Sequence, residues 1–123
     1  MQVGDTTSWE RTFTVEDVER FGQISGDLGV HHVKPDAQGR LLVQGLLTAT
    51  LPTKLGGDLN FIARDMTFQF LRPVFTSDTI HCENTITRLE VQEERTLVEA
   101  AFTCRNQQGK EVLTGQVRGI VRK

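Results

Sequence analysis

The residues of this chain that could do chemistry gather in one stretch of its first third. Asp27 lies five residues before His32, and His31 directly precedes His32. A carboxylate and an imidazole are side chains that commonly exchange protons with a substrate or hold a reacting water. The sequence does not show which of the two side chains would act as the acid and which as the base. The plain alternative is that Asp27 is a loop residue after a helix and that His32 is an exposed loop side chain.

A glycine at the start of an apolar segment is the second candidate feature. Gly45 opens the run GLLTATLPTKLGG, whose apolar residues fall on most sides of a helix, as expected of a helix surrounded by protein. The backbone N–H of such a glycine can stabilise negative charge, and no Cβ obstructs a ligand. The alternative is a glycine required only for packing. Gln44 before it is expected either at the surface or beside a bound carbonyl group.

Other kinds of site lack their required partners in the sequence. His31, His32 and Asp36 have no fourth residue at the spacing of metal ligands, so neither a zinc site nor any other cofactor is predicted. Gly56-Gly57 ends a predicted helix and does not join a strand to a helix, which argues against a phosphate loop. No serine has the G-x-S-x-G context of a nucleophile.

Composition limits the class of protein. The 123 residues predict one domain over 1–123, and a net charge of −2 without a basic cluster argues against nucleic-acid binding. No apolar run is long enough to cross a membrane, and the polar N-terminus does not resemble a signal peptide, so a cytoplasmic protein is expected. Cys82 and Cys104 lie in strand-like runs and are expected to be reduced core residues.

Hydrophobic periodicity predicts the helix that precedes the polar cluster. Apolar residues recur every three positions, which predicts a helix over residues 15–24. Thr14 is a suitable N-cap and Asp17 occupies the third helical position, a near-capping box. Gly26 follows where a left-handed residue often ends a helix. Residues 25–44 are then expected to form a loop, in which His31 and His32 point in different directions.

The second half of the chain changes to strand-like patterns. The apolar helix that Gly45 opens should end at Gly56-Gly57 and be kinked near Pro52. The alternating segments after it predict an antiparallel meander of four consecutive strands, with a fifth strand near the N-terminus. The expected strands cover residues 66–74, 78–91, 95–106, 110–123 and 9–13. This order of elements predicts an α+β domain.

Several of these segments together resemble a known family. FTVEDVERFGQISGD is followed by His32, by VQGLL and by FLRPVFTSDTI. The chain thereby resembles the MaoC-like (R)-specific enoyl-CoA hydratases, in which a helix ends in Ser-Gly-Asp and a His follows five residues after the Asp. In that family a His-Gly pair opens the buried helix, and Arg-Pro-Val and Gly-Asp-Thr follow later. The resemblance covers nearly the whole chain and implies the hot-dog fold, a sheet wrapped around one apolar helix.

Three positions depart from the family pattern. The family usually has Asn-Pro between the Asp and the His, where this chain has Gly29-Val30. The family His before the helix glycine is Gln44 here. The segment between His32 and Gln44 is shorter than usual, which would reduce the overhang that bounds the acyl pocket. These departures affect the expected rate and substrate more than the expected fold.

The resemblance implies reversible hydration of trans-2-enoyl thioesters to (R)-3-hydroxyacyl thioesters, carried by CoA or by acyl carrier protein. Asp27 and His32 would hold and polarise the water, and the N–H of Gly45 would receive the thioester carbonyl. The family spacing selects His32 over His31, with the reverse assignment left open. Further substrate-binding candidates are Gln44, His31, Arg64 and Arg72, and Lys54 is a further cation for CoA phosphates. The resemblance also implies a homodimer with pockets at the subunit interface.

Two other functions remain open at this point. A hot-dog thioesterase often draws a carboxylate from the buried helix, but residues 45–57 contain no Asp or Glu. A non-catalytic acyl-CoA binding module is favoured by Gln44 and by the missing Asn-Pro. It is disfavoured because both Asp27 and His32 are present.

Overall fold

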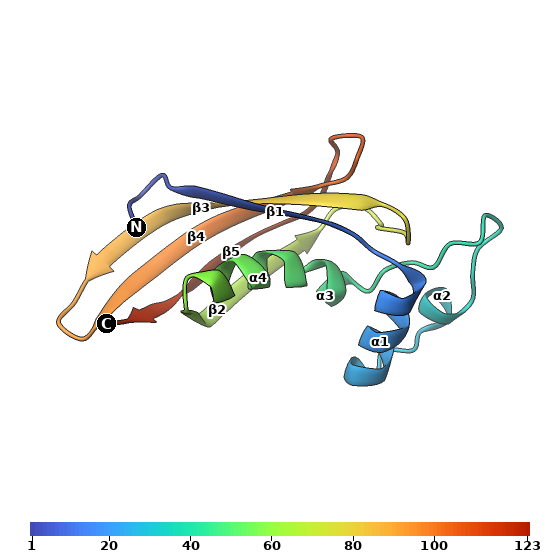
Figure 1. Cartoon of the computed structure of the whole chain (residues 1–123), viewed down its shortest axis with the longest axis horizontal. Helices are drawn as coiled ribbons and strands as arrows, with labels where there is room; N and C mark the ends of the chain where they lie inside the picture. Colours follow the sequence, from blue (N-terminus) through green and yellow to red (C-terminus); the bar gives the residue numbers. More distant parts are fainter.

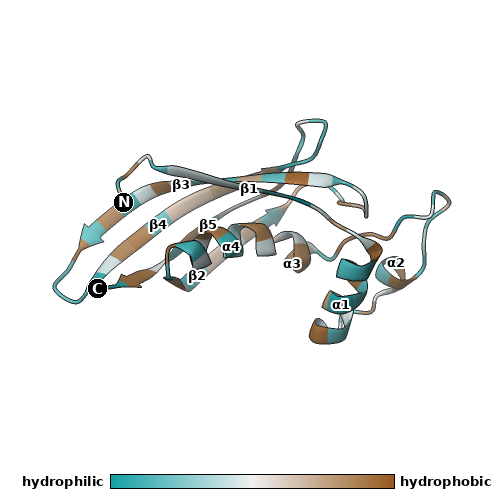
Figure 2. Ribbon diagram, in the orientation of Figure 1, coloured by the Kyte–Doolittle hydropathy of each residue, from teal (hydrophilic) through white to brown (hydrophobic).

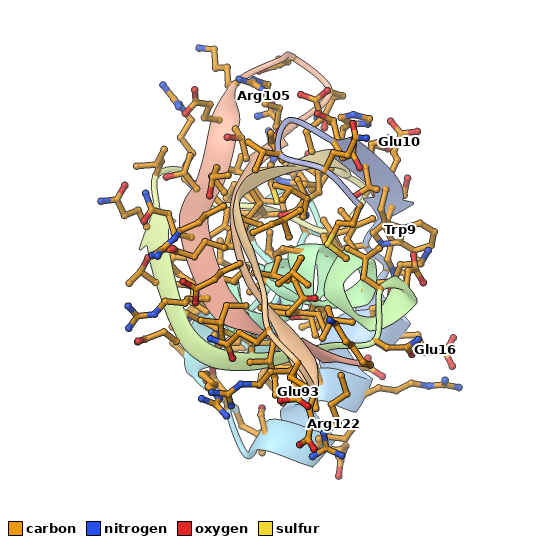
Figure 3. All side chains as sticks on the ribbon, turned by 90° about the vertical axis from the view of Figure 1, so that its left-hand side faces the viewer. Trp9, Glu10, Glu16, Glu93, Arg105 and Arg122 are labelled. Carbon is orange, nitrogen blue, oxygen red and sulfur yellow. The ribbon has the colours of Figure 1, made fainter.

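Five antiparallel strands form one curved sheet around an apolar helix (Figure 1). The computed structural model describes all residues, 1–123. Seen from one end, the sheet curls around this helix and side chains fill the space between them (Figure 3). The fold is therefore the predicted α+β hot-dog arrangement. Its elements are β1 (Thr6–Thr12), α1 (Val15–Ser25), α2 (Val30–Val33), α3 (Gly45–Thr48), α4 (Thr50–Asp58), β2 (Phe61–Phe70), β3 (Thr79–Val91), β4 (Arg95–Arg105) and β5 (Glu111–Arg122).

The sheet order corrects the prediction of a four-strand meander. The strands run β1-β3-β4-β5-β2, so only β3, β4 and β5 are consecutive neighbours. The predicted strand 66–74 is β2 (Phe61–Phe70), and it pairs with β5 at the far edge. The free edge of β3 is taken by β1, from Thr6 opposite Thr85 to Thr12 opposite Thr79. Because alternation within a strand carries no information about its neighbours, the sequence pattern could not reveal this crossover.

The buried helix is interrupted one turn before Pro52. α3 ends at Thr48, Ala49 has a ψ of −11°, and α4 then continues from Thr50. Proline cannot donate the backbone hydrogen bond that Thr48 would receive in a regular helix, and its ring presses on that carbonyl. The hydroxyl of Thr53 donates to the Ala49 carbonyl oxygen at 2.9 Å. The irregularity predicted near Pro52 is present, and it divides the helix into two segments.

The core lies between the two helical segments and the concave face of the sheet. Leu51 and Leu55 are buried against inward side chains of the strands. Phe13, just before α1, is fully buried in the same core. Figure 2 shows apolar colouring along the strands that face the helix. Cys82 and Cys104 are opposite each other on β3 and β4, and both are buried and free, as predicted. No helix has the length and apolar character needed to span a bilayer.

Helix α1 carries the complete capping box that the sequence predicted. The N–H of Asp17 donates to Thr14 Oγ1 at 3.1 Å, and the N–H of Thr14 donates to Asp17 Oδ2 at 2.9 Å. Partial burial alone would raise the pKa of Asp17. The hydrogen bonds from Thr14 and the nearby guanidinium of Arg11 outweigh it and hold that pKa below its usual 3.8.

Asp17→Asn should therefore lower the free energy of unfolding by about 1 kcal/mol at neutral pH. A carboxyl whose folded pKa is depressed stabilises the fold above its unfolded pKa, 3.8, and that contribution is lost as the pH falls through the folded value. Urea unfolding at pH 7 and at successively lower pH checks this. Glu16→Gln, in the same helical turn but outside the box, is the matched control. A difference between Asp17→Asn and the wild type that stays constant down to pH 2 would contradict the assignment.

Candidate active site

The end of α1 positions Asp27. Gly26 has a φ of 75°, a left-handed conformation that glycine adopts without strain, and its N–H donates to the Gly22 carbonyl. The chain turns there, and the N–H of Asp27 donates to Ser25 Oγ at 3.0 Å. The carboxyl group is thus held just beyond the last turn of the helix. Its side chain is 51% exposed.

His31 and His32 lie in one helical turn and not in the extended loop expected from the sequence. The N–H of His32 donates to the Gly29 carbonyl at 2.8 Å, which closes the first turn of α2 (Val30–Val33). In a turn this tight the two rings stay close, with centroids 4.1 Å apart and an angle of 69° between their planes. His32 is nevertheless buried, whereas His31 is exposed. Both rings line the same cavity, His32 as a buried side chain and His31 as an exposed one, so that which of them faces a reacting water stays a prediction.

The ring of His32 is oriented by a hydrogen bond on one nitrogen and faces Asp27 with the other. Nδ1 lies 2.6 Å from the backbone carbonyl oxygen of Leu42, so the neutral ring carries its hydrogen on Nδ1 and donates it there. Nε2 is then the acceptor nitrogen, and it lies 3.5 Å from Oδ2 of Asp27. A water touching both atoms could donate one hydrogen to Nε2 and the other to the carboxylate. The pair therefore has the geometry of a site that holds and polarises water.

Gly45 borders the same cavity as His32. The cavity has a volume of about 380 Å³ and is lined in part by Thr48, Phe70 and Arg72. As the first residue of α3, Gly45 has no partner for its N–H within the helix. A Cβ on Gly45 would lie 2.7 Å from the ring of Phe70. The glycine is thus required by close packing in this structure, and its N–H is also available at the cavity that contains His32.

Gln44 does not occupy the place expected for it. Its side chain is buried, and Nε2 donates to the backbone carbonyl of Val18 at 3.0 Å. It does not line the cavity of His32, and it is not a surface residue. The amide instead ties the start of the buried helix to α1, and its Oε1 has no hydrogen-bond partner in the protein. Sequence position alone could not show this, because a residue before a helix can turn inward or outward.

The cationic candidates separate into two groups. Arg72 lines the cavity of His32, and its guanidinium donates to the Glu111 carbonyl at 2.7 Å. Arg64 lies elsewhere, in a hollow that it shares with Arg88 and Arg95 on the sheet. Lys54 pairs with Asp58 at 2.7 Å on the last turns of α4. Of these three candidates, only Arg72 borders the cavity that contains His32.

Two residues at the site were not anticipated from the sequence. Thr48 is buried on the cavity wall, and its hydroxyl has no hydrogen-bond partner in the protein. Phe70 covers Gly45 from the edge strand β2. The pattern TATLPT does place Thr48 one turn after Gly45, which is a usable signal. Nothing in the alternation of β2 indicates that Phe70 reaches the helix. No cluster of three or more His, Cys, Asp and Glu side chains has the arrangement of a metal site.

Comparison with known proteins finds matches among solved structures. No protein-family model and no curated protein matches the sequence. The (R)-hydratase from A. caviae involved in PHA biosynthesis matches 97% of this chain and 96% of its own, with 25% identity and a TM-score of 0.86. The R-hydratase PhaJ1 from Pseudomonas aeruginosa matches 99% of this chain and 82% of its own, with 22% identity and a TM-score of 0.85. A MaoC-like dehydratase from Rhodospirillum rubrum matches 100% of this chain and 94% of its own, with 18% identity and a TM-score of 0.77.

These matches define the class. The chain has the hot-dog fold of the MaoC-like hydratases and dehydratases over nearly its full length, as the sequence resemblance implied. At identities of 18–25% the likeness concerns the fold, and the particular activity has to be argued from the site.

Proposed function

We propose that this protein catalyses the reversible hydration of trans-2-enoyl thioesters to (R)-3-hydroxyacyl thioesters. The observation that carries the proposal is the Asp27–His32 pair, 3.5 Å apart, in which Leu42 directs the acceptor nitrogen of His32 toward the carboxylate. The (R) configuration follows from the likeness to the (R)-hydratases and is part of the proposal. The thioester carrier is CoA or acyl carrier protein.

The proposed reaction begins with the water held between Nε2 of His32 and the Asp27 carboxylate. The water oxygen bonds to C3 of the enoyl group while one of its protons passes to the pair. The electron pair of the C2–C3 double bond moves toward the thioester carbonyl, which becomes an enolate. The pair then returns one proton to C2, so that one water has been added and both side chains regain their original state.

The developing charge on the thioester oxygen requires a donor. The N–H of Gly45 lies at the start of the buried helix, where backbone dipoles favour negative charge, and it borders the cavity of His32. The hydroxyl of Thr48 is available one turn further along the same wall. Both groups support the placement of the carbonyl against α3. Arg72 at this cavity provides a cation for the phosphates of a CoA or carrier-protein arm.

The proposal includes a homodimer. The edge strand β2 exposes apolar side chains that a monomer in water would leave uncovered, among them Ile62, Met66 and Phe70, with Leu71 just beyond the strand. An open edge strand with an apolar face is a common site of association between copies. Because Phe70 also covers Gly45, a partner at this edge would help to enclose the cavity.

A thioesterase is the second candidate. The single carboxylate of the buried helix is Asp58, at its far end, and it is exposed and paired with Lys54. This arrangement offers no carboxylate at the start of the helix beside the cavity of His32, and it favours hydration over thioester cleavage.

An absorbance assay with crotonyl-CoA separates the candidate functions. Hydration removes the absorbance of the conjugated thioester without releasing a thiol, and this is the expected result. Release of free thiol would instead indicate a thioesterase. Binding of the thioester without either change would indicate a non-catalytic module and would refute the proposed reaction.

A further inference from the structure

The backbone of Gly29 does not require a glycine. Gly29 is the N-cap of α2, and its φ of −53° and ψ of 147° are values that other residues adopt without strain. A Cβ placed on Gly29 would instead lie 3.0 Å from Cε1 and 3.2 Å from Nε2 of His31. The ring of His31 therefore fills the space that a side chain at position 29 would take.

The same ring lies beside Asp27, where α1 and α2 are next to each other (Figure 1). The Cβ position on Gly29 is 3.6 Å from Oδ1 of Asp27, so the ring and the carboxylate border one small space. The N–H of Gly29 donates to this oxygen at 3.4 Å, while the other carboxylate oxygen faces Nε2 of His32. The centroids of the two histidine rings are 4.1 Å apart. Asp27 and His32 thus share a second imidazole as a neighbour.

A charge on His31 would act on both members of the pair. Histidine is the side chain that gains a positive charge between about pH 8 and pH 5. A positive charge on His31 stabilises the carboxylate of Asp27 and opposes a second positive charge on His32. In the proposed reaction the pair has to take up a proton from the water. Both effects oppose this step, so they have the same sign.

The other charged groups around His31 keep their charge in this pH range. Arg72 lines the same cavity, and Lys34 is the C-cap of α2. Arginine and lysine side chains stay protonated at these pH values. On the loop after α2, Asp36 pairs with Arg40 at 3.0 Å, and the backbone N–H of Arg40 helps to hold the pKa of Asp36 below its usual 3.8. His31 is exposed at the cavity and can exchange protons with water.

We infer that His31 is a positioning residue of the Asp27–His32 pair, whose ring lies beside the carboxylate because position 29 is a glycine, and whose charge opposes proton uptake by the pair as the pH falls. His31 acts through the pair and does not itself take the proton. The inference rests on the proposed function for the reaction, whereas the place of the ring rests on the packing at Gly29 alone. Hydration should therefore decline at mildly acid pH sooner than protonation of a single histidine would make it.

Gly29→Ala tests the place of the ring without an assay of activity. Alanine fits this backbone conformation and restricts the unfolded chain, so it should raise the urea midpoint of unfolding wherever its Cβ has room. In a His31→Ala background the room exists, and the midpoint should rise. In the wild-type background the new Cβ meets the ring, and the midpoint should rise less or fall. The same change in both backgrounds would show that the ring does not occupy this space, and it would overturn the inference.

The pH profile of crotonyl-CoA hydration tests the effect of the charge. His31→Gln keeps a polar side chain of similar size that cannot become charged. The ratio of kcat/KM at about pH 5.5 to kcat/KM at about pH 8 should be about threefold higher in this variant than in the wild type. Water around an exposed ring screens its charge, which limits the effect to this scale. His81→Gln removes another exposed histidine, on β3, and as the matched control it should leave the ratio unchanged.

Failure of the inference and failure of the proposed function give different results. If crotonyl-CoA is hydrated and His31→Gln has the wild-type ratio, the inference is overturned and the reaction stands. If the wild type does not hydrate crotonyl-CoA at any pH, the proposed function is refuted, and the effect of His31 on that reaction is refuted with it. The comparison of urea midpoints then still decides whether the ring of His31 occupies the space beside Asp27.

Discussion

Asp27→Asn and His32→Ala are each expected to lower the rate of enoyl thioester hydration by roughly 10²- to 10⁴-fold, the scale of one lost acid or base. Both side chains contact the same water in the proposed reaction. Their losses should therefore not multiply, and the double variant should be little slower than the slower single variant. Initial rates with crotonyl-CoA, divided by the concentration of folded protein, measure this. Asp27 is half exposed, whereas His32 is buried and bonded to Leu42, so division by the folded fraction matters most for His32→Ala.

The neighbouring histidine is the informative comparison. His31→Ala should retain most of the activity, because its ring is exposed, and both the approach to Asp27 and the hydrogen bond to Leu42 belong to His32. His81→Ala, on the outside of β3, controls for the loss of a surface histidine. Full activity in Asp27→Asn or in His32→Ala would eliminate the pair as the catalytic groups. A loss confined to His31→Ala would assign the role to the other ring.

Gly45→Val is expected to lower kcat/KM far more than it lowers stability. Loss of one positioned oxyanion donor is worth about 2.7–4 kcal/mol in other enzymes, which sets the upper scale here. In this structure the new side chain would also press on the ring of Phe70, 2.7 Å from the position of the Cβ. A simple measurement of activity would therefore mix a packing effect with a catalytic one.

A Phe70→Ala background separates the two effects, since it removes the ring that the new side chain would meet. Gly45→Val in that background should unfold at nearly the same urea concentration as Phe70→Ala alone and still show the loss in kcat/KM. If the double variant instead turns over crotonyl-CoA as fast as Phe70→Ala, the N–H of Gly45 has no part in the reaction and the glycine serves packing alone.

The elements that depend on local pattern could be predicted from the sequence. The capping residues Thr14 and Asp17 placed the start of α1, and Gly26 placed its end, because caps require particular side chains and backbone angles. The disturbance before Pro52 follows from the chemistry of proline. The five-residue separation of Asp27 and His32 was enough to bring them together, since one short turn connects them.

The features that depend on distant contacts could not be predicted in this way. β2 pairs with β5, and this pairing depends on hydrogen bonds and side-chain contacts between segments that lie far apart in the chain. Gln44 turns inward and donates to the Val18 carbonyl of α1, a contact between distant segments that no local pattern reveals. The helical turn that holds the two histidines has only four residues, too few to show a period.

The break in the buried helix at Ala49 gives the protein two independently adjustable parts. The segment before it carries Gly45, and the segment after it carries Thr53 and Gly56, which border a second cavity of about 200 Å³ between α4 and the sheet. A substitution that shifts or resizes the later segment does not have to move the earlier one, because no regular helix transmits the change across Ala49. Duplicated copies of such a gene could therefore diverge in the shape of this second cavity while the backbone around Gly45 keeps its place.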